Sequence, residues 1–169
     1  MVIIIILLTI LLISLITDVT KRKILNIVTF PAIIFAFIYY SVSLGINGFL
    51  FSGKGFLVGL SLLIIPYLLG GMGAGDVKLV AAIGALMGTS FVFSSFIYIA
   101  LIGGVIALLL ILKRNGFKYS IKTFFYQIVF LQGNLGELIF QSDKKNSITF
   151  PYGVAITIGT ICTLVWGEY

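Results

Sequence analysis

Long apolar runs that carry no charge restrict this sequence to very few folds. Residues 2–17 are nearly all Ile, Leu and Val, and residues 27–44 and 55–69 contain no charged side chain. Only 9% of the chain is charged, against about 25% in a typical soluble domain. Inside a bilayer every backbone N–H and C=O must be paired within the protein, and an apolar run of this length achieves that as a helix. We therefore expect an all-α, polytopic membrane protein.

Six apolar segments approach the length that crosses a bilayer, for which a helix needs about 17–25 residues. They cover residues 2–19, 27–44, 55–70, 77–90, 92–112 and 149–166. The stretch from 77 to 112 would overshoot the bilayer as one helix, at about 1.5 Å per residue, so we divide it near Gly88. Its small residues predict close helix packing. We expect a turn at 45–54 and treat 1–169 as a single transmembrane domain.

The segment at 113–148 is polar and basic, and it is expected to form a loop. Within it, Ile121, Phe124, Phe125 and Ile128 follow the i, i+3, i+4, i+7 spacing of an apolar helix face. Such a helix lies on the membrane surface or packs on the protein's own spans, and both alternatives stay open.

Six spans sort the basic residues very unequally between the two sides. One side receives Lys21, Arg22, Lys23, Lys78, Lys113, Arg114, Lys118, Lys122, Lys144 and Lys145. The other side receives Lys54. Because short loops rich in Lys and Arg stay in the cytoplasm, we expect both termini outside it and the segment 113–148 inside. The net charge of +6 then reflects cytoplasmic loops beside anionic lipid, and we expect no nucleic-acid partner.

A glycine-rich stretch between two apolar runs brings in the acidic chemistry. Residues 70–78 read GGMGAGDVK, so a flexible backbone delivers Asp76 at the edge of a span. Asp18 holds the matching place at the end of the first span, and the charge asymmetry puts both at the cytoplasmic face. An acidic side chain at a membrane span is costly and indicates a functional site. We expect the fold to bring the two aspartates together.

Two adjacent carboxyl groups can activate water without any other group. They share one proton, so one carboxylate accepts a proton from water while the other carboxyl donates to a carbonyl oxygen. The chain has no histidine and one cysteine, Cys162, which excludes His-based catalysis and multi-cysteine metal sites. We expect no cofactor and no metal. The alternative is that each aspartate caps a helix or pairs with a nearby base such as Lys21 or Lys78.

The glycine-rich stretch closely resembles a known motif. Residues 73–76 form a GxGD sequence, and GMGAGDVKL after an apolar segment resembles the type IV prepilin peptidase family. The basic loop that follows Asp18 resembles the family's first aspartate motif, although Leu25 stands where proline is common. The sequence Pro151-Tyr152-Gly153 resembles its proline-aromatic-glycine motif. Presenilin-like proteases also carry GxGD, but their first aspartate lies inside a helix and not before a basic loop.

The resemblance implies an aspartic endopeptidase with Asp18 and Asp76 as its catalytic pair. Such enzymes cut the short basic leader from pilin-like precursors at the cytoplasmic face of a prokaryotic plasma membrane. The substrate partner would be a pilin-like precursor, with the lipid bilayer around the enzyme. The chain resembles the short, peptidase-only form found in tight-adherence pilus systems or archaeal preflagellin peptidases, so we expect no methyltransferase activity.

Residues near the two motifs are candidates for binding substrate or shaping loops. In the GxGD loop these are Gly73, Gly75 and Lys78, and in the last motif Pro151, Tyr152 and Gly153. At Gly75 we expect a positive φ or a tight approach of substrate. Lys78 would pair with an acid of the substrate or anchor the chain at the interface. Asn26 would cap the second span or orient Asp18.

Two other functional classes are compatible with the aspartate pair. A small ion- or proton-coupled transporter would use the carboxylates to bind a cation, although transporters usually place such groups near the midplane and contain internal repeats. A non-enzymatic assembly factor would not need the aspartates for any cleavage. Leader removal from a co-expressed precursor separates the peptidase from both.

Overall fold

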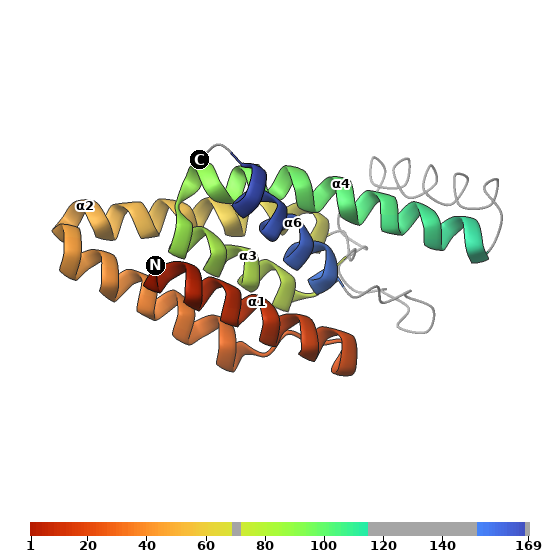
Figure 1. The fold of residues 1–169 in the computed structure, drawn as a ribbon, viewed down its shortest axis with the longest axis horizontal. Coiled ribbons are helices and arrows are strands. Elements are labelled where there is room, and N and C mark those ends of the chain that lie inside the picture. The colour runs from red at the N-terminus through yellow and green to blue at the C-terminus, as the bar shows by residue number, and fades with distance from the viewer. Residues whose placement is uncertain (69–71, 115–151, 168–169) are drawn as a thin grey trace, which may run out of the picture. The chain divides into compact units, whose positions relative to one another are not determined.

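The described part of the chain is all-α. The computed structural model describes residues 1–68, 72–114 and 152–167, in which there are five helices and no strand (Figure 1). The helices are α1 (Val2–Lys21), α2 (Asn26–Leu68), α3 (Ala74–Met87), α4 (Thr89–Arg114) and α6 (Tyr152–Trp166). By length and composition, α1, α2 and most of α4 are each able to cross a membrane, whereas α6 is a shorter apolar helix.

Two compact units divide the chain. Residues Met1–Gly103 and Thr149–Tyr169 form the first, and Gly104–Ile148 the second. The helix α4 begins in the first unit, and everything described below belongs to that unit. The amphipathic segment expected within 113–148 lies outside the described residues, of which 114 is the last in this region.

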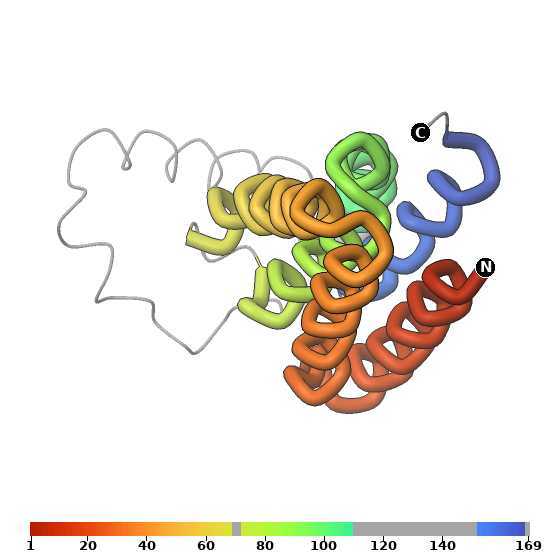
Figure 2. Tube along the Cα trace, turned by 90° about the vertical axis from the view of Figure 1, so that its left-hand side faces the viewer, coloured from red at the N-terminus to blue at the C-terminus, as the bar shows by residue number. Residues whose placement is uncertain are grey.

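A sharp kink at Gly45 divides α2 into two arms. As one straight helix its 43 residues would measure about 65 Å, roughly twice a bilayer core. Gly45 has φ 60° and ψ −138°, a conformation that glycine adopts without steric cost, and the chain reverses there (Figures 1 and 2). Phe37 and Phe49 join the arms with ring centroids 5.3 Å apart. The expected turn at 45–54 is therefore wrong, because one glycine makes the bend and residues 46–54 are helical.

The central helix of this unit is α3, which α2 contacts most closely. Its side chains Leu79, Val80, Ile83 and Leu86 are fully buried. A Cβ placed on Gly84 would collide with the backbone of Gly55 in α2, and one on Gly55 with that of Gly84. Such an approach is possible only between glycines. The expected close packing of small residues is thus present, and it fixes α3 against α2.

Hydrogen bonds from α2 complete the carboxyl end of α3. The Tyr40 hydroxyl donates to the Leu86 carbonyl at 2.8 Å, and Ser52 Oγ donates to the Ala85 carbonyl at 3.0 Å. These carbonyls belong to the last turn, where a helix leaves acceptors unpaired. The helix ends at Met87, and Gly88, with φ 85°, turns the chain into α4, within the stretch where we placed the junction.

The helices α1 and α6 pack against each other and against α3. The buried face of α1 carries Leu7, Leu11, Ser14 and Asp18, which follow helical spacing. Apolar side chains fill this face up to Leu11, Ser14 follows, and in the last turn a carboxylate takes the same inward position. Residue spacing alone therefore directs Asp18 into the protein and not towards lipid.

We predict that Thr20 and Asn47 lie on opposite sides of the membrane. Both residues are exposed, and one arm of α2 separates them. In a Cys162→Ser background, the single variants Thr20→Cys and Asn47→Cys should react with an impermeant thiol reagent from opposite sides, Thr20→Cys from the cytoplasm. Ser52 is unsuitable as a reporter because it is fully buried. Labelling of both variants from one side would contradict the predicted crossing.

Candidate active site

Asp18 is placed by the end of α1. The helix stops at Lys21, and Arg22 adopts the left-handed conformation with φ 51° and ψ 38°. The N–H of Arg22 donates to the Asp18 carbonyl at 2.8 Å, which closes the last turn. The side chain of Asp18 is 5% exposed. The basic loop that leaves α1 therefore begins directly beside a buried carboxylate.

Asp76 is placed by the start of α3. Its Oδ2 accepts a hydrogen bond from the N–H of Gly73 at 2.9 Å, and its own N–H donates to the Gly73 carbonyl at 3.1 Å. This reciprocal pair resembles a capping box in which the backbone of glycine replaces a capping side chain. An acid in the first turn is also favoured by the helix dipole. Asp76 is 8% exposed, so the glycine loop holds its carboxylate inside the protein.

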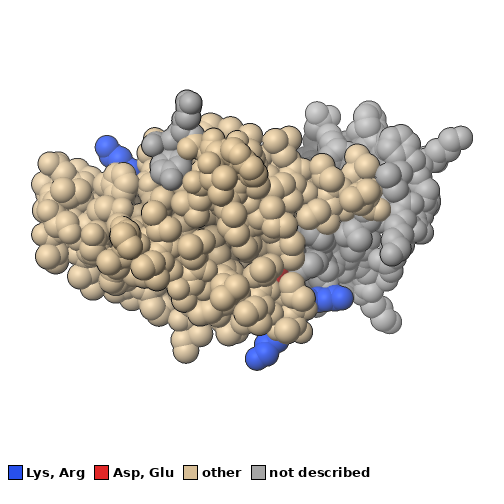
Figure 3. Space-filling model, in the orientation of Figure 1, with Lys and Arg blue, Asp and Glu red and all other residues tan. Residues whose placement is uncertain are grey.

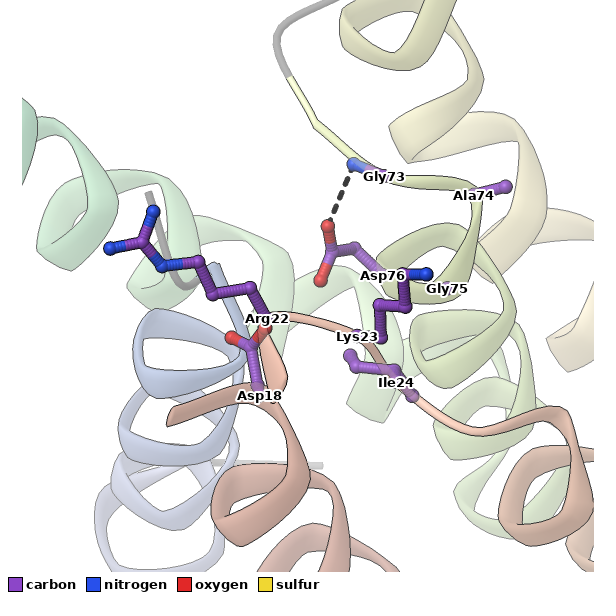
Figure 4. Close-up of a pocket in the computed structure, with 8 residues that line it drawn as sticks. All are labelled: Asp18, Arg22, Lys23, Ile24, Gly73, Ala74, Gly75 and Asp76. Atoms are coloured by element: carbon purple, nitrogen blue, oxygen red, sulfur yellow. Dashed lines mark hydrogen bonds between the residues drawn. The ribbon is translucent and has the colours of Figure 1, made fainter. Parts of the chain in front are cut away.

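The two carboxyl groups line one pocket. Its walls are formed by Asp18, Arg22, Lys23, Ile24, Gly73, Ala74, Gly75 and Asp76 (Figure 4). The pocket measures about 220 Å³, which is room for several waters at about 30 Å³ each. On the face drawn in Figure 3, only a small acidic patch is visible beside basic side chains. The expectation that the fold brings the aspartates together is met in this structure.

Burial changes the acidity of Asp76, which precedes the expected span at 77–90. Loss of solvent raises its pKa to about 6, the N–H of Gly73 lowers the pKa, and the nearby Asp18 raises it. A carboxyl with this pKa gives up and takes back a proton close to neutral pH. The site therefore holds an acid–base group that needs no histidine.

Gly75 does not have the positive φ that was one of the two alternatives expected for it. It lies within α3 and is not among the described glycines with positive φ, which are Gly45 and Gly88. Its lack of a side chain instead allows a close approach by the loop after α1. A Cβ on Gly75 would lie 3.0 Å from Ile24 Cβ and 3.2 Å from the Ile24 carbonyl oxygen. The tight neighbour is thus the chain's own loop, and the contact joins the two walls of the pocket.

Lys78 lies outside the pocket lining. Its Nζ donates to Asn26 Oδ1 at 3.0 Å and lies 5.3 Å from the centroid of the Phe30 ring, within the range of a cation–π contact. Lys78 follows Asp76 by two residues, and Asn26 follows the pocket residue Ile24 by two. This hydrogen bond is a second link between the starts of α2 and α3.

The last motif reaches the site through Gly153. The N–H of Gly153 donates to Asp18 Oδ2 at 2.7 Å, from the first turn of α6. Tyr152 is half-buried near Gly103 of α4, and Pro151 lies outside the described residues. The pocket residues Arg22, Lys23, Ile24 and Ala74 were not proposed from sequence. The sequence feature that could have identified them is their position next to, or within, the two aspartate motifs.

We predict that an added methyl group is tolerated at Gly73 but not at Gly75. Gly73 has φ −85° and ψ 152°, which any residue adopts, and its Cβ would meet Asp76 Oδ2 at 3.4 Å. At Gly75 the added Cβ crowds Ile24, and overpacking of this kind costs about 1–3 kcal/mol. Thermal unfolding of the purified protein should therefore show a lower Tm for Gly75→Ala, and a still lower one for Gly75→Val, with Gly73→Ala unchanged. Equal Tm values for the two alanine variants would show that the Ile24 contact is loose.

Comparison with known proteins places this site in a family. No curated protein and no solved structure matches the chain. Residues 5–108 match the type IV leader peptidase family, and this range is more than half of the 169 residues. It contains both aspartates, the basic loop and the GxGD loop, while Gly153 lies beyond it. On this match the chain belongs to the type IV leader peptidase family, as the resemblance of its motifs predicts.

Proposed function

We propose that this peptidase is a membrane-embedded aspartic endopeptidase that removes the short basic leader from type IV pilin-like precursors. The observation that carries the proposal is the pocket lined by two buried carboxyl groups, one from α1 and one from α3. The chain that contains it belongs to a leader peptidase family. Asp18 and Asp76 are the catalytic residues. Nothing in the described part of the chain favours the transporter hypothesis.

The reaction needs only water and the two carboxyl groups. One carboxylate takes a proton as the water oxygen attacks the scissile carbonyl carbon, and the protonated partner donates to the carbonyl oxygen. Collapse of the tetrahedral intermediate breaks the C–N bond. The aspartate that took the proton from water gives it to the leaving amine, and the other aspartate takes back a hydroxyl proton, so the pair is restored. The Oδ2 atom of each aspartate accepts a hydrogen bond from the backbone N–H of a glycine. We therefore assign Oδ1 of each aspartate to the contacts with water and the substrate peptide.

The surroundings of the pocket support a site at the cytoplasmic face. Lys21, Arg22 and Lys23 lie three to five residues after Asp18, and Lys78 lies two residues after Asp76. Such clusters mark the cytoplasmic end of membrane helices. The proposed topology has six crossings, which are α1, the two arms of α2, the part of α3 that follows Asp76, α4 and α6. The enzyme is thus a multi-pass protein of a prokaryotic plasma membrane, surrounded by lipid.

We predict that Asp18→Asn and Asp76→Asn each abolish cleavage. Asparagine keeps the size of the side chain but cannot exchange the proton that the reaction requires. Co-expression with a pilin-like precursor, scored by the mass of the mature product, should show leader removal near background for each variant at normal membrane levels. The double variant should be scarcely worse than either single variant, because residues that act as one unit are strongly non-additive.

Two acidic residues elsewhere provide the matched controls. Glu137→Gln and Asp143→Asn each remove one carboxylate from the segment between α4 and α6, and both should leave cleavage unchanged. Substantial leader removal by either Asp18→Asn or Asp76→Asn would refute the two-aspartate mechanism. Inactivity of the two control variants as well would indicate a general response to loss of charge.

A further inference from the structure

The start of α6 makes a direct contact with a carboxylate of the site. Gly153 is buried, and its N–H donates to Asp18 Oδ2 at 2.7 Å. The N–H groups of a first helical turn have no partner within the helix, so this bond satisfies the donor and the carboxylate together. A hydrogen bond to a charged acceptor is short and roughly twice as strong as a neutral one. It therefore restricts how the Asp18 side chain can turn.

The same contact leaves no room for a side chain at Gly153. An added Cβ would lie 2.7 Å from Oδ2, 2.9 Å from Cβ and 3.0 Å from Cγ of Asp18. These distances are below van der Waals contact, so one of the two partners would have to move. Gly153 is not among the described residues with positive φ. Space beside Asp18, and not backbone conformation, is thus what requires glycine here.

The rest of α6 is held in place by contacts away from the carboxylate. A Cβ on Gly159 would lie 2.6 Å from Ile99 Cγ1 and 2.7 Å from the Ile99 backbone nitrogen, so α6 and α4 already touch there. Since α6 is fixed on this side, pressure from a side chain at 153 would fall on Asp18.

We propose that Gly153 is a positioning residue for Asp18. This inference rests on the proposed function, in which Asp18 is catalytic. The N–H of Gly153 fixes Oδ2 of Asp18 as the N–H of Gly73 fixes Oδ2 of Asp76. The relative position of the two carboxyl groups is then set by two backbone donors, one at the start of each helix. The start of α6 therefore takes part in the active site through its hydrogen bond to Asp18, although no residue of α6 lines the pocket.

The kinetic test compares Gly153→Ala with Gly159→Ala in the full-length protein. Each variant adds one methyl group to a tightly packed glycine of α6, but only the first crowds the carboxylate. In phospholipid vesicles with a pilin-like precursor, Gly153→Ala should lower kcat about 100-fold with KM unchanged, as a displacement near 1 Å can. Gly159→Ala should lower Tm and keep the kcat of the folded enzyme. Wild-type kcat in Gly153→Ala, or an equal loss in Gly159→Ala, overturns the proposal.

A stability cycle tests the contact without any substrate. Gly153→Ala should lower Tm in the wild-type protein but hardly at all in an Asp18→Gly background, where the opposing side chain is absent. Such non-additivity is the signature of residues in contact. Equal losses of Tm in both backgrounds overturn the contact and the proposal with it.

One reference variant separates the two levels of inference. If Asp18→Asn keeps its activity, the proposed function fails and the positioning role fails with it, although the Tm coupling remains. If Asp18→Asn is inactive while Gly153→Ala cleaves at the wild-type rate, the positioning role alone fails.

Discussion

Burial of two carboxyl groups in an apolar helical bundle is the constraint on which this structure depends. A carboxylate removed from water is costly unless it is hydrogen-bonded, and this chain has no histidine with which to share the proton. Backbone N–H groups at the starts of α3 and α6 provide these hydrogen bonds, because helix starts leave such donors unpaired. The N–H of Gly73 donates to Asp76, and the N–H of Gly153 donates to Asp18. Helix starts are thereby the polar part of the site, and at Gly153 the lack of a side chain lets the carboxylate come close.

Close contacts at glycines hold α3, and with it Asp76, in position against the neighbouring helices. The helix α3 has only 14 residues. Its position is fixed by α2, at the close contact between Gly55 and Gly84. At the other end of α3, Gly75 meets Ile24 in the loop that leaves α1. The hydrogen bond from Lys78 to Asn26 joins the same two segments at the surface. Two contacts, Gly75 with Ile24 and Lys78 with Asn26, thus relate the start of α3 to the segment that follows α1, and through it Asp76 to Asp18.

The sequence predicted the parts of the site that depend on residue type and local spacing. Asp18 and Asp76 stood out because acids are rare in such a chain and because each lies at the edge of an apolar segment. Contacts across long separations had no local signal, such as Gly153 with Asp18, 135 residues apart. The turn at 45–54 was wrong for a related reason. Glycine and serine looked like loop residues, but Gly48 and Ser52 are buried against helices, where small residues permit contact and Ser52 finds a carbonyl acceptor.

Function and stability oppose each other at Asp76. Its pKa is raised to about 6, whereas an aspartate in an unfolded chain titrates near 3.9. The folded protein therefore binds this proton more tightly than the unfolded chain does. The stabilising contribution of the group is complete below the unfolded pKa and is lost as pH rises through about 6. At neutral pH the ionised carboxylate of Asp76, at the start of α3, accordingly disfavours the folded state. A neutral side chain of the same size, as in Asp76→Asn, would remove this unfavourable ionisation. Loss of activity in that variant therefore need not involve loss of the fold.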